Sequence, residues 1–432
     1  MTERFCRAQS LPRSLYTDTA RPAVDTPPLV GERSVEVAIV GGGYTGLSAA
    51  LHLAGRGVEA CVVERNEIGW GASGRNGGQV NPGLYPDPEA IAATFGEERG
   101  MRMLRFASGA PDLVFSLIEK HGITCEAARG GTIRAAFNAS GARRVASTLG
   151  QLRDRGLPAE ALGQAELAQA TGTDRYNSAI FFPQGGKLNP LGYARGLGEA
   201  AIGAGATVHG ATPALELARE GSRWRLRTPG GGLLAERIVL ATNGYTDGLW
   251  PKLRRSIVPV YTTIVASAPL APDIAARILP GGAVLYEVGN NTVYYRLDAE
   301  NRLLMGGRSP IRDVTSMADA ARLRQYAERL WPVLEGISWT HVWNGQVAIT
   351  IDHNIHLHEP ARGVLISLGY NGRGIAMATA MGEVLARRIS GEAVETLPMP
   401  VTGLRPIRFH SLWKPATAAR LAYGGLCDRL GF

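Results

Sequence analysis

The chain has 432 residues, 45% of them hydrophobic, and a formal net charge of +8. This length allows two domains with cores of their own, so no disulfide or metal is needed to stabilise the fold. The basic residues are spread along the chain instead of forming a block, which argues against a nucleic-acid partner, although a local positive field could attract a carboxylate-bearing substrate.

The cysteines show no C-x-x-C pair, which argues against a zinc site and a disulfide framework and favours a reducing compartment. They are Cys6, Cys61, Cys125 and Cys427. The first residues contain no apolar stretch typical of a secretory signal, and no apolar run approaches the ~20 residues of a transmembrane helix. We therefore expect a cytoplasmic protein without a transmembrane segment.

In chain order, a polar surface arm is expected over residues 1–33. Residues 35–40 form a short apolar run typical of a buried parallel strand. Helical spacing of apolar residues follows from 45 to 56, and residues 59–64 have the pattern of a second strand. Together these segments predict a βαβ unit.

The turn inside this unit carries G-x-G-x-x-G, with its glycines at 41, 43 and 46. Gly41 permits a sharp turn, Gly43 leaves room for a pyrophosphate, and Gly46 lets the helix pack closely on the strand. The helix N-terminus offers unpaired amides and partial positive charge to phosphate. Glu64, at the end of the second strand, is placed to bind ribose hydroxyls and would repel a 2′-phosphate. The motif therefore predicts FAD or NAD, not NADP.

Two further segments are rich in glycine and other small residues, so that their backbone amides can approach a bound cofactor closely. Residues 71–79 are mostly small, and Ser73 and Arg75 could add a hydroxyl and a charge near a phosphate. Near the other end, a strand over residues 364–367 leads through residues 369–374 into a helix that ends near Ser390. The amides of that helix could stabilise negative charge on a reduced flavin.

The intervening stretches differ from the βαβ unit. Residues 86–184 are expected to be largely helical, and residues 251–345 are expected to be mostly strand. The clearest elements are helices over 111–121, 142–155 and 317–331, and strands within 203–217 and over 224–228, 237–241, 286–288, 292–297 and 303–306.

These patterns predict a mixed α/β and α+β fold, in which a Rossmann-type FAD-binding domain is joined to a discontinuous antiparallel-sheet substrate domain, with the active site at their seam. We assign residues 34–85, 185–250 and 346–400 to the FAD-binding domain, residues 86–184 and 251–345 to the substrate domain, and residues 401–432 to a C-terminal helical segment.

The three glycine-rich segments together resemble the D-amino acid oxidase-like family of FAD-dependent amine and amino-acid oxidoreductases, most closely its γ-glutamylputrescine oxidoreductase branch. The similar strings are VAIVGGGYTGLSAALHLA, GWGASGRNGGQV, ATNGYTDGLWPKLRR, GYNGRGIAMATAMGEVLA and Ser14-Leu15-Tyr16. The resemblance implies that Ala214, on a strand after Gly210, contacts adenine through its backbone. The full implied FAD-binding set is Gly41, Gly43, Tyr44, Thr45, Gly46, Glu64, Arg65, Gly71, Ala72, Ser73, Arg75, Asn76, Gly77, Gly78, Gln79, Ala214, Thr242, Asn243, Gly244, Gly369, Tyr370, Gly372, Arg373, Gly374 and Ile375.

The chain also departs from the family. Ala376 stands where sarcosine oxidases carry a carboxylate-binding lysine, and residues 303–307 lack the lysine that activates oxygen there. The resemblance therefore does not establish a simple α-amino acid as the substrate or oxygen as the electron acceptor. Residues 342–368 contain no cysteine that could attach flavin, so non-covalent FAD is expected. Asn354 replaces a frequent proline, which is expected to alter only a loop.

Several residues could have either a functional or a structural role. His353, His356 and His358 could belong to a metal site, but no matching further ligand is evident, so no metal is expected. Four aromatic residues could enclose an amine or belong to the sheet core: Tyr286, Tyr294, Tyr295 and Trp343. Arg308 could bind a distal carboxylate or be a solvated surface residue. Residues 412–430 could pack or lie on a membrane surface, and their mostly small apolar residues favour packing.

The resemblance implies oxidation of an amine C–N bond to an imine, which water converts to a carbonyl product. The expected substrate is a small amine, such as a γ-glutamylputrescine-like compound, another secondary amine or an amino acid, with dioxygen or another compound as electron acceptor. Alternatives are an amine dehydrogenase with a non-oxygen acceptor, a flavoprotein acting on RNA bases, and a flavin-binding protein without turnover. The flavin carries the hard chemistry, so no catalytic triad is expected. The candidate catalytic residues are His353, Tyr370 and Arg373.

Overall fold

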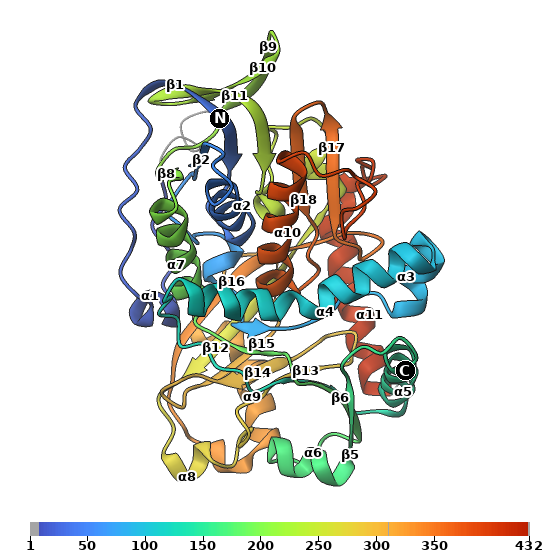
Figure 1. The fold of residues 1–432 in the computed structure, drawn as a ribbon. Helices are drawn as coiled ribbons and strands as arrows, with labels where there is room; N and C mark the ends of the chain where they lie inside the picture. Colours follow the sequence, from blue (N-terminus) through green and yellow to red (C-terminus); the bar gives the residue numbers. More distant parts are fainter. Residues whose placement is uncertain (1–7, 310, 431–432) are drawn as a thin grey trace.

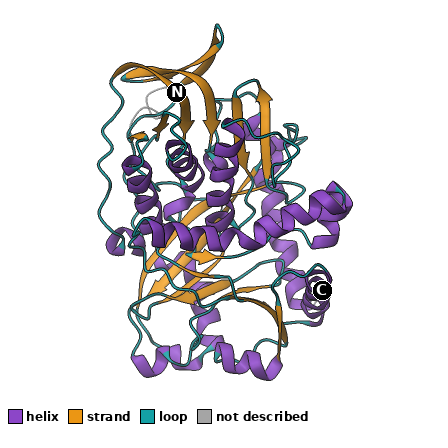
Figure 2. Cartoon of the chain, in the orientation of Figure 1, coloured by secondary structure: helices purple, strands orange, loops and turns teal. Residues whose placement is uncertain are grey.

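The computed structural model describes residues 8–309 and 311–430, and two large sheets dominate it (Figure 1). The first seven residues of the expected arm, including Cys6, and the last two residues of the C-terminal segment lie outside the described part. Figure 2 shows helices flanking the strands of both sheets.

The first sheet has eight strands in the order β17-β18-β11-β1-β2-β8, with β10 paired to β11 and β9 to β10. The strands β18, β11, β1, β2 and β8 run parallel. Their carboxyl ends therefore share one edge, which is where open α/β sheets bind ligands. The bounds are β1 Gly31–Val40, β2 Ala60–Val63, β8 Thr207–His209, β9 Glu216–Glu220, β10 Arg223–Thr228, β11 Gly231–Leu240, β17 His356–Ala361 and β18 Val364–Leu368.

Helices α2 (Tyr44–Ala54), α7 (Pro190–Gly203) and α10 (Gly374–Ile389) form a buried apolar core against one face of this sheet. Helix α4 (Glu97–Lys120) joins the same core through residues such as Met103 and Val114, although it precedes the second sheet in sequence. Figure 1 shows α4 crossing between the two sheets. The division into domains, including the boundary after residue 85, stays a prediction.

The second sheet, expected to be antiparallel, has the order β16-β12-β15-β14-β13-β4-β6-β5 and contains one parallel pair, β13 with β4. Apolar residues of α9 (Ala321–Leu330), α8 (Pro272–Ala275) and α6 (Gln164–Thr171) join the core on one face. The bounds are β4 Thr132–Ala136, β5 Glu160–Gly163, β6 Ser178–Phe182, β12 Val258–Ser267, β13 Val284–Glu287, β14 Tyr294–Leu297, β15 Leu303–Arg308 and β16 Trp339–Ile349. A third, two-stranded sheet pairs β3 (Gln79–Val80) with β7 (Gly186–Lys187).

The remaining helices are α1 (Leu15–Thr19), α3 (Pro88–Phe95), α5 (Ala139–Asp154) and α11 (Trp413–Leu430). Among residues 8–309 and 311–430, none of the helices has both the length and the apolar character needed to cross a bilayer.

Several elements differ from expectation. Strand β1 begins at Gly31, inside the arm expected over residues 1–33, and Leu15 and Tyr16 of this arm are buried in α1 instead of lying on the surface. The helix expected over residues 111–121 begins at Glu97, so Pro111 lies inside α4 instead of at its start. Pro111 has no amide to donate to the carbonyl of Ala107, and the amide of Gly83 donates to that carbonyl instead, at 2.9 Å. Helix α7 was not predicted; it begins with Pro190 at its first position, where Asn189 caps it through a hydrogen bond from the amide of Gly192.

Candidate cofactor and substrate cavity

A cavity of about 760 Å³ lies at the carboxyl ends of β1, β2 and β11, where Val40, Val63 and Leu240 line it. Its size falls within the ~300–1,000 Å³ of typical ligand pockets. The glycine-rich segments around residues 41–45, 71–79 and 372–375 form its walls, and the second sheet contributes residues from β13, β14, β15 and β16.

The first wall is the turn between β1 and α2. Gly41 has φ +115°, and a Cβ at this position would lie 2.9 Å from the carbonyl oxygen of Ala241. At Gly46 a Cβ would overlap the carbonyl oxygen of Gly41, so this glycine sets the close approach of α2 to the turn. Gly43 caps α2, and a Cβ there would lie 2.8 Å from Ser73 Oγ. The turn therefore has no space for a side chain at Gly41 or Gly46, and a side chain at Gly43 would displace the hydroxyl of Ser73.

Glu64 is fixed at the end of β2 by two backbone amides. Its Oε2 accepts a hydrogen bond from the amide of Gly42 at 2.7 Å, and its Oε1 accepts one from the amide of Asn66 at 2.9 Å. Burial raises the pKa of Glu64, whereas these amide donors lower it. The carboxyl group is thereby held at the cavity wall, next to the glycine turn.

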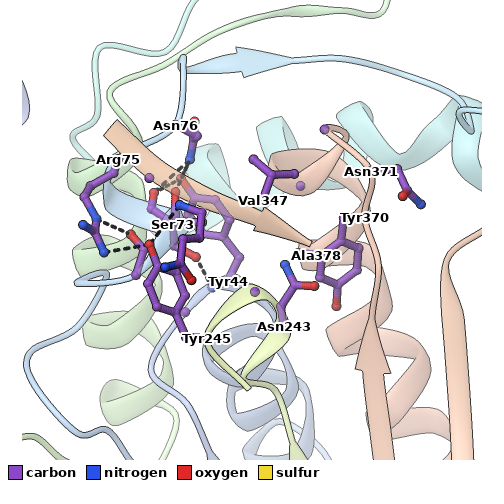
Figure 3. Close-up of a pocket in the computed structure, with 18 of the residues that line it drawn as sticks. Tyr44, Ser73, Arg75, Asn76, Asn243, Tyr245, Val347, Tyr370, Asn371 and Ala378 are labelled. Atoms are coloured by element: carbon purple, nitrogen blue, oxygen red, sulfur yellow. Dashed lines mark hydrogen bonds between the residues drawn. The ribbon is translucent and has the colours of Figure 1, made fainter. Parts of the chain in front are cut away.

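The second glycine-rich segment is tied to the N-terminus of α2 (Figure 3). It begins with the short 3-10 helix η2 (Ala72–Gly74), and Ser73 Oγ accepts a hydrogen bond from the amide of Tyr44 at 3.1 Å. Asn76 Nδ2 donates to the hydroxyl of Tyr44 at 3.1 Å and to the carbonyl of Ser73 at 3.0 Å. The first two glycine-rich segments thus form one continuous wall.

Arg75 is only 7% exposed and lies among aromatic side chains. Its Nη2 donates to the hydroxyl of Tyr245 at 2.7 Å, and its guanidinium lies 4.5 Å from the centre of the Trp70 ring. Figure 3 shows Arg75 directed towards Tyr245, which belongs to η3 (Asn243–Tyr245). The cationic group is thus held at the cavity wall by a hydrogen bond and a cation–π contact.

The third glycine-rich segment connects the first sheet to the second. Arg373 is the N-cap residue of α10; its Nη1 donates to the carbonyl of Pro82 at 3.0 Å and its Nη2 to the hydroxyl of Tyr286 at 2.9 Å. The Tyr370 hydroxyl lies 2.6 Å from Thr45 Oγ1, and burial raises the pKa of Tyr370 to about 12. Tyr370 is therefore a neutral buried link, and Arg373 holds the edge of the cavity against the second sheet.

Strand register decides which aromatic residues face the cavity. Tyr286 pairs with Tyr294, and both line the cavity. Tyr295 is on the opposite face, because successive side chains of a strand alternate, and it packs against Trp331 in the core with ring centres 5.0 Å apart. Trp343 is also buried in a core cluster, 5.1 Å from the ring of Tyr16. Each of the two interpretations therefore holds for two of the four residues. Tyr286 and Tyr294 line the cavity, whereas Tyr295 and Trp343 belong to the core.

Arg308 ends β15 on the same face as Tyr294, because Tyr294 pairs with Gly306 and Arg308 follows two residues later. The residue lines the cavity and is partly buried. Within the described part of the chain, its guanidinium makes no hydrogen bond and no ion pair. A cation in this position is available to an anionic group that enters the cavity.

His353 lies at the cavity wall with φ +55°, and its ring stacks on Tyr85 with centres 4.4 Å apart. Burial lowers the pKa of His353, and its Nδ1 is buried without a hydrogen-bond partner among the described residues. His356 and His358 lie outside this lining and stack on each other at 5.1 Å. Among residues 8–309 and 311–430, no group of three or more histidine, cysteine or acidic residues is arranged to hold a metal.

Most of the predicted cofactor residues line this one cavity. Gly46, Gly78 and Gly369 do not, and all three are positions where a Cβ would meet neighbouring backbone or side-chain atoms. Ala214 lines the cavity from a loop between β8 and β9, so its placement on a strand was wrong. The others that line it are Gly41, Gly43, Tyr44, Thr45, Glu64, Arg65, Gly71, Ala72, Ser73, Arg75, Asn76, Gly77, Gln79, Thr242, Asn243, Gly244, Tyr370, Gly372, Arg373, Gly374 and Ile375.

Other lining residues were not predicted. Tyr245 lies inside one of the similar strings, so its position beside Gly244 was an available signal. Residues of β12 and β16 carried no motif that could have identified them. The lining residues missed include Trp70, Tyr85, Thr262, Gly345, Gln346, Val347, Asn371 and Ala378, of which Val347, Asn371 and Ala378 are labelled in Figure 3.

The fold and the cavity define a Rossmann-type dinucleotide-binding protein with a second sheet over the ligand site. The residues present fit a dinucleotide, since a glycine turn without room for a Cβ and a fixed carboxylate at the end of β2 lie in the same cavity.

Residues 36–388 match the family model described as FAD dependent oxidoreductase, and the chain belongs to this family. It is 29% identical to the γ-glutamylputrescine oxidoreductase of Escherichia coli strain K12 over 416 residues, which cover 92% of this chain and 93% of the relative. It is 30% identical to a probable oxidoreductase OrdL of Rhizobium meliloti strain 1021 over 371 residues, covering 85% and 86% of the two chains. The structure of glycine oxidase from Geobacillus kaustophilus is similar with a TM-score of 0.72 at 23% identity, covering 85% of this chain and 98% of that one. The expected fold class and FAD dependence are thereby confirmed.

Proposed function

We propose that this chain oxidises the C–N bond of a small amine that also carries a carboxylate. The observation that carries the proposal is the shared cavity, which is lined both by the glycine turn at Gly41–Gly43 and by Arg308, a cation without an ion-pair partner among the described residues. The names of relatives support the reaction class, since they include a γ-glutamylputrescine oxidoreductase and a glycine oxidase.

The geometry of the walls supports a proposed place for each part of FAD. The α2 N-terminus with Gly43 would hold the pyrophosphate, and Glu64 would hold the ribose hydroxyls. Gly372, Arg373 and Gly374 would lie beside the flavin ring. When bound, FAD supplies the acceptor for a hydride removed from the carbon next to the nitrogen.

The chain's own residues would bind and orient the amine. Arg308 would pair with the carboxylate through a charge-assisted hydrogen bond, and Tyr286 and Tyr294 would form the aromatic floor beneath the substrate. His353 lines the cavity and would accept the amine proton, and its lowered pKa favours the neutral ring that this role needs. Water would then hydrolyse the imine to a carbonyl compound.

The test is an anaerobic mixture of the purified holoprotein with a panel of amines, followed by flavin absorbance. The panel pairs each amino acid or γ-glutamylated diamine with its analogue that lacks the carboxylate. We expect loss of the yellow absorbance with a carboxylate-bearing amine and a much slower change with its neutral analogue. An unchanged flavin spectrum with every amine would contradict the proposal.

The electron acceptor is tested in the same cuvette. Admission of air after reduction gives rapid return of colour and hydrogen peroxide if oxygen is the acceptor. Slow return in air, with rapid return on addition of a soluble quinone, identifies a dehydrogenase.

A further inference from the structure

The C-terminal helix α11 has an apolar face that nothing in the described structure covers. Its inner face contacts the turn between β13 and β14, where Asp428 accepts hydrogen bonds from the amides of Asn290 and Asn291, both at 2.9 Å. In Figure 1, α11 lies at one side of the molecule, beside the second sheet. The expectation of a packed helix therefore holds for one face only.

The outer face carries large apolar side chains at helical spacing. Tyr423 and Leu426 of α11 are 64% and 54% exposed, and Leu412, directly before α11, is 57% exposed. With Ala416 and Ala419 between them, these residues form a stripe at helical spacing. Phe409, just before the helix, is 80% exposed. Four of the ten exposed large apolar residues of the described chain therefore lie within this single stretch.

Unpaired positive charge gathers at the start of this helix. The amide of Ile407 donates to the carbonyl of Arg255 at 2.7 Å, and His410 Nε2 lies 2.8 Å from the carbonyl of Ile257. These contacts bring the segment before α11 against η4 (Leu253–Ser256). Six exposed basic residues lie in or directly beside η4 and from residue 405 to the start of α11, and they form no ion pair among the described residues: Lys252, Arg254, Arg255, Arg405, Arg408 and Lys414.

We propose that this C-terminal surface, made of the apolar stripe and the six basic residues, docks on an anionic phospholipid bilayer. A helix lying in the plane of a membrane interface buries its apolar side in the acyl boundary, and adjacent cations contact the negative headgroups. Arg405, Arg408 and Lys414 lie on the same segment as the stripe, and the other three basic residues lie at η4, which this segment contacts.

Charge favours a lipid surface over a second copy of the chain. Asp428 is the only acidic residue from 401 to 430, and it is already bonded to Asn290 and Asn291. A symmetric dimer through this surface would therefore place cations against cations. The exposed leucines favour lipid over RNA, because a phosphate backbone offers no apolar phase in which to bury them.

The test is co-sedimentation of the flavin-loaded full chain with vesicles. Vesicles of phosphatidylcholine alone are compared with vesicles containing about one-third phosphatidylglycerol, at low salt and at about 0.5 M salt. We expect roughly tenfold more protein to sediment with the anionic vesicles at low salt, and high salt to release most of it.

Two variants separate the contributions of the surface. Leu412→Ser with Leu426→Ser removes the stripe, and Arg405→Gln with Arg408→Gln removes charge; both should lose most vesicle binding and keep full flavin absorbance. The matched control, Leu215→Ser with Val333→Ser, changes apolar residues that are 43% and 40% exposed elsewhere and should bind vesicles like the parent chain.

Three results would overturn the proposal. The first is a parent chain that stays in the supernatant with anionic vesicles at low salt. The second is a dimer in light scattering that the leucine variant abolishes, which would make this surface an interface between copies. The third is retention of RNA, lost in the arginine variant, without any vesicle binding. None of these readouts depends on the proposed amine oxidation.

Discussion

Arg296 Nε donates a hydrogen bond to the carbonyl oxygen of Gly77 at 2.7 Å, and this contact joins β14 of the second sheet to the second glycine-rich segment. The guanidinium is buried, and its Nη2 also donates to the carbonyl of Leu188 at 3.2 Å. One arginine of the second sheet thus holds the loop that lines the cavity.

Replacement of Arg296 should loosen that loop. Arg296→Met leaves the carbonyls of Gly77 and Leu188 without donors, and we expect a loss of about 2–4 kcal/mol in the free energy of unfolding, together with weaker FAD retention. Thermal unfolding and the FAD-to-protein ratio after gel filtration measure both effects. Arg322→Met, an exposed position on α9, is the control. Equal FAD retention in the two variants would show that Arg296 does not support the loop.

Arg308→Gln should affect substrate binding more than turnover. Loss of a charge-assisted hydrogen bond costs about 1.5–3 kcal/mol, so KM for a carboxylate-bearing amine should rise roughly 10–100-fold while kcat changes little. The analogue without a carboxylate is the internal control and should show the same KM in both proteins. A uniform loss of kcat for both substrates would contradict the assigned contact.

His353→Gln should change the pH profile of the reaction. Burial, together with the charges of Arg308 and Arg420, lowers the pKa of His353 below 6.5, while Asp352 raises it. If the neutral ring accepts the amine proton, kcat/KM in the parent chain should fall on acidification through a value below pH 6.5. The variant should lack this acidic limb and be slower at pH 7. Superimposable profiles would assign His353 a purely structural role with Tyr85.

Glu287 should make stability depend on pH. Burial raises its pKa from 4.5 to about 7, although hydroxyl donors from Tyr326 and Tyr176 lower it. The folded chain therefore holds a proton that the unfolded chain releases, and stability falls as pH rises from about 4.5 to about 7. The whole change is on the order of 3 kcal/mol.

Glu287→Gln keeps an acceptor for the two tyrosines and removes the titration. Denaturant unfolding of the parent and the variant across this pH range measures the difference. We expect the variant to be the more stable of the two at pH 8 and the difference to shrink towards pH 4.5. A constant difference across the range would show that Glu287 does not titrate between these values.

Local signals in the sequence were sufficient to predict the glycine-rich walls of the cavity. A turn that excludes a Cβ at Gly41 and Gly46 can only be built from glycine, so its spacing is visible without tertiary information. The same holds for Glu64, whose place at the end of β2 follows from the length of the βαβ unit.

The substrate side could not be derived in the same way. The sequence Tyr294-Tyr295 shows that the two rings alternate, but only the packing of Tyr295 against Trp331 in the core decides that Tyr294 faces the cavity. The long helix α4 depended on the tertiary contact from Gly83 to the carbonyl freed by Pro111, which has no local signature.

The most direct test of the account is a titration of flavin-stripped protein with FAD, in the parent chain and in Gly43→Val. The added side chain would enter the space where Ser73 Oγ lies 2.8 Å from an ideal Cβ, at the N-terminus of α2. Gly109→Val, at an exposed glycine on α4, is the control because a Cβ there meets no atom within 4 Å. We predict one FAD per chain for the parent and the control and none for Gly43→Val; full FAD binding by Gly43→Val would contradict the site described for this protein.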